Sequence, residues 1–217
     1  MGTLIHATLE DLNRFAIAGR YDEITEELIK KWFALNYAKM QESTGLMLSE
    51  ERRKSALDQV LNYFDKRKEH IRKVWKAEEK VELVLPEYIL QGVIDLIEDD
   101  DGKIEIVDYK TGRKPDLPEK SAQVEHYRKQ LEIYAYLISE RYKKNVSRMH
   151  LYYTNEAEEN PLVTFEYSKN CVDKEIEDVS QTVRKIEDKR FDAKAENDYS
   201  CRYCDMKYMC KKVKNYD

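Results

Sequence analysis

Three residues near the middle of the chain have the types and the spacing of a metal-dependent hydrolytic site. Asp95 stands in one apolar segment and Asp108 and Lys110 stand in the next, with Asp101 and Gly102 between the segments. Asp-Gly is a favoured pair for a two-residue hairpin loop, because both central positions need a positive φ. With this loop Asp100 pairs with Lys103, and the residue numbers of every further cross-strand pair also add up to 203. The hairpin is therefore predicted to set Asp95 opposite Asp108.

This pairing predicts that the negative charge of the two carboxylates is compensated. Directly opposed side chains have Cβ atoms roughly 5 Å apart, and like charges there repel each other. Two carboxylates in apolar strands therefore require a cation between them or a proton on one of them. Lys110 projects from the same face as Asp108, because it follows two residues later. Such a cluster is the minimal set of a metal-dependent phosphodiester hydrolase, although a hairpin with a solvated polar face carries the same residues.

The segments around the hairpin predict a mixed α/β fold. Residues 3–78 carry apolar residues at helical spacing and are predicted to be helical, with the last helix starting after Ser49. Residues 79–85 alternate between apolar and polar side chains and predict the first strand. After the hairpin we expect a helix, two strands and a further helix, over residues 121–142, 147–154, 161–167 and 171–188. This order indicates a mixed central sheet flanked by helices, with an N-terminal helical insertion.

The length and composition favour one domain over residues 1–217, with a core over residues 79–190 and a Cys-rich tail over residues 199–217. The chain is 41% hydrophobic and 37% charged, and it contains no apolar run of membrane-spanning length. Its N-terminus lacks a basic segment followed by an apolar stretch, so a cytoplasmic location is expected. The net charge of -5 argues weakly against non-specific coating of nucleic acid but allows a local basic groove.

Six short motifs occur in order along the chain. They are Gly2-x-x-x-His6, an acidic residue at Glu79, Gly92-x-Ile94-Asp95, Asp108-Tyr109-Lys110-Thr111-Gly112, Gln130-x-x-x-Tyr134, and Cys201-x-x-Cys204 followed by Cys210. In this combination the chain resembles the PD-(D/E)XK nucleases of the RecB-like group, and more narrowly the nuclease domain at the C-terminal end of UvrD/AddB-type helicase polypeptides. The resemblance implies a restriction-endonuclease-like fold and hydrolysis of DNA phosphodiester bonds.

The resemblance also implies a divalent metal ion, held by His6, Asp95, Asp108 and the backbone carbonyl of Tyr109. Carboxylates are hard oxygen ligands that suit Mg²⁺ or Mn²⁺. Such an ion neutralises the scissile phosphate and lowers the pKa of a bound water. Lys110 would direct a positive charge at the attacking water or at the developing phosphorane oxygens. By itself, His6 could also be a helix histidine bonded to a neighbouring carbonyl, and the downstream motifs favour the ligand.

Two residues on the helix after the hairpin are expected to serve the same site. Gln130 and Tyr134 are four residues apart, so they face the same way. They would contact a DNA phosphate or hold Lys110 in place. For Tyr134, a position in the core with Gln130 at its rim is an equal alternative.

Further charged residues are candidates for supporting roles. Glu79 could orient a metal-bound water or His6, although it could also be a charge at the strand edge, and Glu82 competes for the assignment. Arg113 and Lys114 follow the second strand of the hairpin directly and are expected to contact phosphate.

The cysteines indicate a second site, in the tail. Cys201, Cys204 and Cys210 lie close together, as metal-binding thiolates do in a cytosolic protein. A [4Fe-4S] cluster or Zn²⁺ takes four ligands, and the resemblance places the fourth cysteine upstream of the Gly2 motif. Either the chain is a domain of a longer helicase polypeptide, or Cys171 is the fourth ligand. Cys171 has no chelating neighbour in the sequence, which favours an ordinary cysteine at the start of a helix.

The resulting hypothesis is a Mg²⁺- or Mn²⁺-dependent nuclease that degrades single-stranded DNA as an exonuclease, with a UvrD-type helicase in DNA repair or recombination. No phosphate-cradling G-x-x-x-x-G-K-[ST] loop is present, so the ATP-dependent motor must be a separate domain or subunit. The alternatives are a CRISPR-associated RecB-like nuclease, a DNA-binding module that does not cleave, and a zinc-binding interaction domain organised by the tail.

Overall fold

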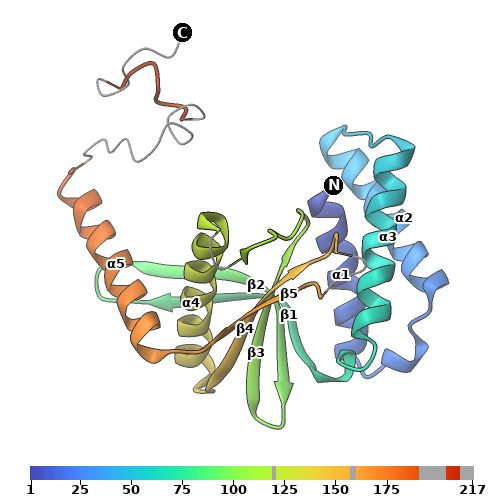
Figure 1. Cartoon of the computed structure of the whole chain (residues 1–217), viewed down its shortest axis with the longest axis horizontal. Helices are drawn as coiled ribbons and strands as arrows, with labels where there is room; N and C mark the ends of the chain where they lie inside the picture. The colour runs from blue at the N-terminus through green and yellow to red at the C-terminus, as the bar shows by residue number, and fades with distance from the viewer. Residues whose placement is uncertain (119–120, 157–159, 191–203, 211–217) are drawn as a thin grey trace. The chain divides into compact units, whose positions relative to one another are not determined.

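A computed structural model of the chain describes residues 1–118, 121–156, 160–190 and 204–210. Its helices and strands are α1 (Gly2–Ile17), α2 (Glu26–Thr44), α3 (Glu50–Arg67), β1 (Val74–Val84), β2 (Ile89–Asp100), β3 (Lys103–Lys110), α4 (Ala122–Tyr142), β4 (Val146–Tyr153), β5 (Leu162–Glu166) and α5 (Lys169–Glu187), with single 3₁₀ turns at Tyr21–Glu23 and Ile71–Lys73 (Figure 1). The chain divides into two compact units, residues 1–176 and residues 177–217.

The first unit is built on a five-stranded mixed sheet in the order β1-β2-β3-β4-β5. Only the β3–β4 pair is parallel; the other three pairs are antiparallel. The parallel pair is connected by α4, as parallel neighbours require a crossover. The β2–β3 hairpin turns at Asp101 and Gly102, which have φ of 52° and 87°. Its register runs from Asp100↔Lys103 to Leu96↔Val107, so the predicted sum of 203 is confirmed.

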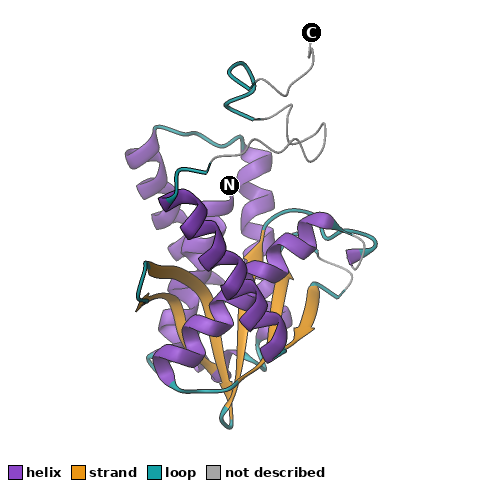
Figure 2. Ribbon diagram, turned by 90° about the vertical axis from the view of Figure 1, so that its left-hand side faces the viewer, coloured by secondary structure: helices purple, strands orange, loops and turns teal. Residues whose placement is uncertain are grey.

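The two faces of the sheet carry separate cores, because side chains alternate along each strand. On one face, α1, α2 and α3 pack over a cluster that includes Leu96, Val107 and Tyr152. On the other face, α4 and the start of α5 pack over a cluster that includes Ile97 and Ile106. Figure 1 shows the three N-terminal helices on one side of the sheet and α4 on the other, and in Figure 2 the strands run behind the helical layer. The predicted α/β architecture is confirmed, including its N-terminal helical region.

Local side-chain chemistry sets several helix boundaries. Thr25, Ser49 and Ser121 each accept a hydrogen bond from the backbone N–H three residues later, which satisfies one unpaired donor at the start of α2, α3 and α4. Gly45 ends α2 in the left-handed conformation, with φ of 69°. None of the helices that the structure describes is long and apolar enough to cross a membrane.

One predicted boundary is wrong in a way that matters for the site. The helical region was expected to extend to residue 78, but α3 ends at Arg67 and β1 begins at Val74. Segment 74–78 pairs with β2, where Ala77 lies opposite Leu96, and this pairing overrides the helical spacing of its apolar residues. The first strand is therefore eleven residues long and starts five residues earlier than predicted.

Candidate active site

Three carboxylates line up across the first three strands at one level of the sheet. In the β1–β2 register, Ala77↔Leu96 and Glu79↔Ile94 flank a position where Glu78 stands opposite Asp95. In the β2–β3 register, the position after Leu96↔Val107 sets Asp95 opposite Asp108. Backbone pairing is interrupted at this level on both sides of Asp95. We call Glu78, Asp95 and Asp108 the acidic row.

Glu78 belongs to this row because its backbone leaves the regular strand. Its φ is 47°, in the left-handed region that a residue with a side chain seldom adopts. Such a conformation costs on the order of 1 kcal/mol or more and is found preferentially at functional sites. Glu79, the acid named from the sequence, accepts a hydrogen bond from Tyr142 and pairs with Lys76, whereas Glu78 lies beside His6 and Asp95. A role for Glu79 at the site stays a prediction.

Asp95 is held from two sides. Its Oδ2 accepts a hydrogen bond of 2.7 Å from the backbone N–H of Tyr109, which takes the place of the next strand-to-strand bond. Its Oδ1 lies 3.5 Å from Nδ1 of His6, which α1 brings to the row. Ligand atoms of His6, Glu78 and Asp95 all lie within 4.8 Å of one another. The structure thus brings together the histidine and the first aspartate that the sequence predicted, and adds an acid that it did not.

Asp108 is the most buried member of the row, with 4% of its surface exposed. Its Oδ2 lies 2.6 Å from Nζ of Lys110, within the range of a charge-assisted contact. Burial and the charge of Asp95 nevertheless raise the pKa of Asp108, against the effect of Lys110. A buried carboxylate beside a second carboxylate is costly unless further positive charge reaches it.

The pKa values in the row reflect crowded negative charge. Burial and then the charge of Asp95 raise the pKa of Glu78 to about 7. The same two causes raise the pKa of Asp108 to about 6, although Lys110 acts in the opposite direction. Burial alone would lower the pKa of His6, but the hydrogen bond and charge of Asp95 raise it. Protons are thus retained where the site lacks positive charge.

Lys110 sits in a set of contacts made by α4. Its Nζ donates a 3.3 Å hydrogen bond to Oε1 of Gln130, whose Nε2 donates a 2.7 Å bond to the hydroxyl of Tyr134. The same Nζ lies 3.8 Å from the ring centroid of Tyr127. Gln130 and Tyr134 were predicted to face the site together, and the structure places them as a chain that ends on Lys110.

Two glycines allow the motifs to approach one another. A Cβ on Gly92 would meet the ring of Tyr134 at 2.9 Å, so the absence of a side chain lets α4 pack closely on β2. A Cβ on Gly2 would meet Oγ1 of Thr111 at 3.1 Å, so the start of α1 lies against the end of β3. These contacts explain in physical terms why motifs far apart in sequence share one site.

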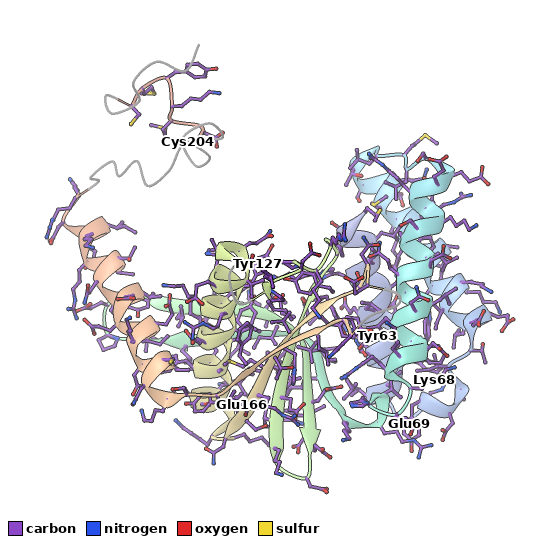
Figure 3. The ribbon with its side chains drawn as sticks, viewed as in Figure 1. Tyr63, Lys68, Glu69, Tyr127, Glu166 and Cys204 are labelled. Atoms are coloured by element: carbon purple, nitrogen blue, oxygen red, sulfur yellow. The ribbon has the colours of Figure 1, made fainter. Side chains whose placement is uncertain are left out.

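A buried polar group supports the row from the helical side. The hydroxyl of Tyr109 accepts a 3.0 Å hydrogen bond from Asn13 and lies 2.7 Å from the hydroxyl of Tyr63, on α3. Figure 3 shows Tyr63 on α3 beside the sheet. Tyr109 carries the N–H that binds Asp95, so these contacts anchor that donor. Sequence reasoning missed Asn13 and Tyr63, since no local pattern connects them with Tyr109.

The remaining predicted residues lie near the site or outside it. Arg113 is highly exposed and 3.8 Å from Asp116, and Lys114 donates to the backbone carbonyl of Asn160. Their contact with phosphate stays a prediction, as does a ligand role for the carbonyl of Tyr109.

The predicted cysteine site is only partly within the described chain. Cys201 lies outside the described residues. Cys204, labelled in Figure 3, is exposed and Cys210 is partly buried, with backbone bonds through Lys207 that form consecutive turns between them. Cys171 belongs to the first unit, on α5, where it interacts with Arg128. A cluster or zinc site in the tail stays a prediction.

The acidic row fits a divalent metal ion. His6, Glu78 and Asp95 offer one imidazole nitrogen and two carboxylates at chelating separation. Asp108 adds a buried carboxylate that Lys110 pairs with at 2.6 Å. Carboxylate-rich sites with an imidazole suit hard divalent cations such as Mg²⁺ or Mn²⁺. Three carboxylates against one lysine leave an excess of negative charge that such an ion would balance.

The comparisons with known proteins agree with this geometry. The chain matches the model of the PD-(D/E)XK nuclease superfamily over residues 1–211. Curated proteins gave no match. Among solved structures, a protein named "Putative exonuclease" from Eubacterium rectale is similar with a TM-score of 0.53 and 10% identity, over 93% of this chain and 77% of that one. SSO0001 is similar with a TM-score of 0.39 and 16% identity, over 81% of this chain and 80% of that one.

At 10% identity, the first of these likenesses shows a shared fold and no more. The family match, in contrast, covers nearly the whole sequence and includes every residue of the acidic row. The mixed five-stranded sheet with helices on both faces is the restriction-endonuclease-like arrangement expected of that family. The chain belongs to the PD-(D/E)XK nuclease superfamily.

Proposed function

We propose that this protein is a metal-dependent deoxyribonuclease whose reaction centre is the acidic row together with His6 and Lys110. The observation that supports the proposal most directly is the charge of this centre. Three carboxylates converge at one level of the sheet, and the lysine described beside them, Lys110, contacts Asp108. A divalent cation supplies the missing positive charge and, when bound, lowers the pKa of a water that can attack a phosphodiester.

The side chains have separate tasks in this proposal. His6, Glu78, Asp95 and Asp108 would hold the ion, with Asp95 oriented by the N–H of Tyr109. The ammonium group of Lys110 is kept near Asp108. From there it offers a positive charge to the phosphate oxygens, where negative charge develops in the transition state. The burial of the row strengthens these electrostatic interactions, because water screens them less.

The sequence motifs support a proposal for the substrate and the partner. We propose single-stranded DNA, degraded from an end, as the substrate, and a UvrD-type helicase domain or subunit as the source of the strand during repair or recombination. The support is the order of the motifs from Gly2 to Cys210 and the seventy-residue helical segment between His6 and the first strand. A cytoplasmic location and an iron–sulfur or zinc site in the tail belong to the same proposal.

The test is cleavage of end-labelled linear single-stranded DNA by the purified protein with Mg²⁺ or Mn²⁺. We expect cleavage that EDTA abolishes and that Asp95→Asn lowers by about a thousandfold or more, in line with the loss of a metal ligand. Circular single-stranded DNA separates attack at ends from internal cutting.

The matched control for this test is Asp100→Asn, on the same strand. Asp100 pairs with Lys73 at 2.8 Å and contacts no member of the acidic row among its recorded partners. We expect its activity to stay within about threefold of the original. Binding of DNA without cleavage under any divalent cation would instead identify the protein as a DNA-binding module.

A further inference from the structure

We propose that Tyr127 is a positioning residue for the reaction: its ring binds the ammonium group of Lys110 through a cation–π contact and keeps it close to Asp108. This inference rests on the proposed nuclease function, and it assigns a role to a residue outside the six motifs. Tyr127 lies on α4, three residues before Gln130, so the two side chains share a face of the helix. Figure 3 labels Tyr127 on this helix.

The geometry is that of a close cation–π contact. Nζ of Lys110 lies 3.8 Å from the centroid of the Tyr127 ring, well inside the roughly 6 Å range of such contacts. Only 15% of the Lys110 side chain is exposed, so the ammonium group is largely removed from water. Cation–π attraction is stronger for a desolvated cation than for an exposed one.

Each contact of Lys110 limits its ammonium group in a different direction. Asp108 Oδ2 is 2.6 Å away, and Gln130 Oε1 accepts a bond of 3.3 Å. Without the Tyr127 ring, these two contacts would leave the flexible four-carbon stem free to move the charge. The Tyr127 ring contacts the ammonium group on the side that Asp108 and Gln130 leave open. The hydrogen bond to Gln130 is long, at 3.3 Å, so this bond alone does not hold the ammonium group in place.

The ring is itself held in place. The hydroxyl of Tyr127 accepts a 2.9 Å hydrogen bond from Nε2 of Gln123, one helical turn earlier. Tyr127 also packs against the core cluster on the α4 face of the sheet. Seating a cation requires the face of the ring and not its hydroxyl. The proposal therefore separates the two parts of the side chain, and each can be removed on its own.

The first measurement is steady-state cleavage of linear single-stranded DNA with Mn²⁺. Tyr127→Leu keeps an apolar side chain but removes the ring, and we expect kcat to fall about 10- to 30-fold, with KM within threefold. Tyr127→Phe keeps the ring and should retain at least a third of kcat. Tyr136→Leu, on the same helix, is the control for loss of a partly buried tyrosine and should stay within threefold.

A double-mutant cycle separates positioning from general damage to the fold. If Tyr127 acts through Lys110, then Tyr127→Leu should lower kcat little further once Lys110→Ala is present. An equal loss in both backgrounds, or a loss in Tyr127→Phe as large as in Tyr127→Leu, would overturn the proposal.

A second readout does not depend on cleavage at all. Protons above an aromatic ring are shifted upfield in the NMR spectrum, so the ε-methylene of Lys110 should carry such a shift, assigned through its loss in Lys110→Ala. The shift should persist in Tyr127→Phe and vanish in Tyr127→Leu. Absence of the shift in the original protein would refute the contact between Lys110 and the Tyr127 ring. A protein that shows the shift but does not cleave DNA would support this contact and refute the proposed function instead.

Discussion

Two sets of opposed carboxylates on the same hairpin have opposite electrostatic outcomes. Asp108, on the face covered by α4, lies level with Asp95 and belongs with it to the acidic row. On the other face, three residues after Asp95 on the same strand, Glu98 lies directly opposite Glu105. Both sets follow from the same register, so a cross-strand pair of acids does not by itself identify a metal site.

The difference lies in the cations that the fold supplies. Arg67, from α3, donates to both oxygens of Glu98 at 2.5 and 2.6 Å, and Arg148, from β4, pairs with Glu105. We call these four residues the paired row, since each acid has its own arginine. In the acidic row, Lys110 pairs with Asp108, and His6 lies beside Asp95. The guanidinium groups neutralise the acids of the paired row, whereas the deficit of positive charge in the acidic row supports the proposed metal ion there.

The largest effect on stability is expected from breaking the paired row. Arg67→Leu leaves the Glu98 carboxylate buried without its partner, with only 3% of that residue exposed. Removal of one member of a buried ion pair typically costs about 3–5 kcal/mol. We expect a loss of that size in the free energy of unfolding, measured in urea. The double variant Arg67→Leu, Glu98→Leu should recover part of it; recovery of nothing would show that the pair does not act as a unit.

Neighbouring glutamates on β1 provide the sharpest test of the acidic row. Glu78 lies with His6 and Asp95, whereas Glu79 is held by Lys76 and Tyr142. We expect Glu78→Gln to lower kcat/KM for DNA cleavage about 100-fold, the typical range for a metal-site residue. Glu79→Gln should stay within about threefold. A larger loss in Glu79→Gln than in Glu78→Gln would restore the sequence-based assignment.

The affinity of the row for Mn²⁺ should depend on pH. The pKa of Glu78 is raised to about 7 and that of Asp108 to about 6 in the metal-free protein. Protons on these groups compete with the ion, so affinity should rise from pH 5 through pH 7 and level off at about pH 8. We expect a gain of about 10- to 100-fold by calorimetry. A flat profile would show that neither group binds the ion.

The smallest effect concerns the metal-free protein. The pKa of Asp108 is higher in the folded state than its ordinary 3.8, because of burial and the charge of Asp95. The ionised carboxylate therefore costs stability, and this cost is absent below about pH 4 and grows as the pH rises to about 6. With EDTA at pH 7.5, Asp108→Asn should raise the free energy of unfolding by about 1–3 kcal/mol. A lower stability than the original protein would contradict this prediction.

Much of the architecture could be predicted because it depends on local chemistry. Asp101 and Gly102 set the loop of the hairpin, and with it the register that brings Asp95 level with Asp108. The four-residue spacing on α4 directs Gln130 and Tyr134 to one side, where they reach Lys110. Tyr127 lies three residues before Gln130, so helical spacing also predicts that it faces the site, but none of the six motifs includes it.

Other parts of the site depend on contacts between distant segments. The choice of Glu78 over Glu79 depends on a left-handed backbone at one position of β1, and regular alternation indicates the opposite choice. The start of β1 at Val74 likewise follows from its pairing with β2, which no local pattern in the chain encodes. The support of Tyr109 by Asn13 and Tyr63 joins residues up to 96 positions apart.

The sequence by itself therefore determined the family and the chemistry that we propose. The types and order of His6, Asp95, Asp108 and Lys110 predict a metal-dependent hydrolytic centre, since ligand type and turn chemistry are local properties. Only the tertiary structure decided which acids lack a counter-charge. The same hairpin presents carboxylates on both of its faces, and the elements that pack or pair beside them determine whether an arginine reaches them, as Arg67 of α3 and Arg148 of β4 do.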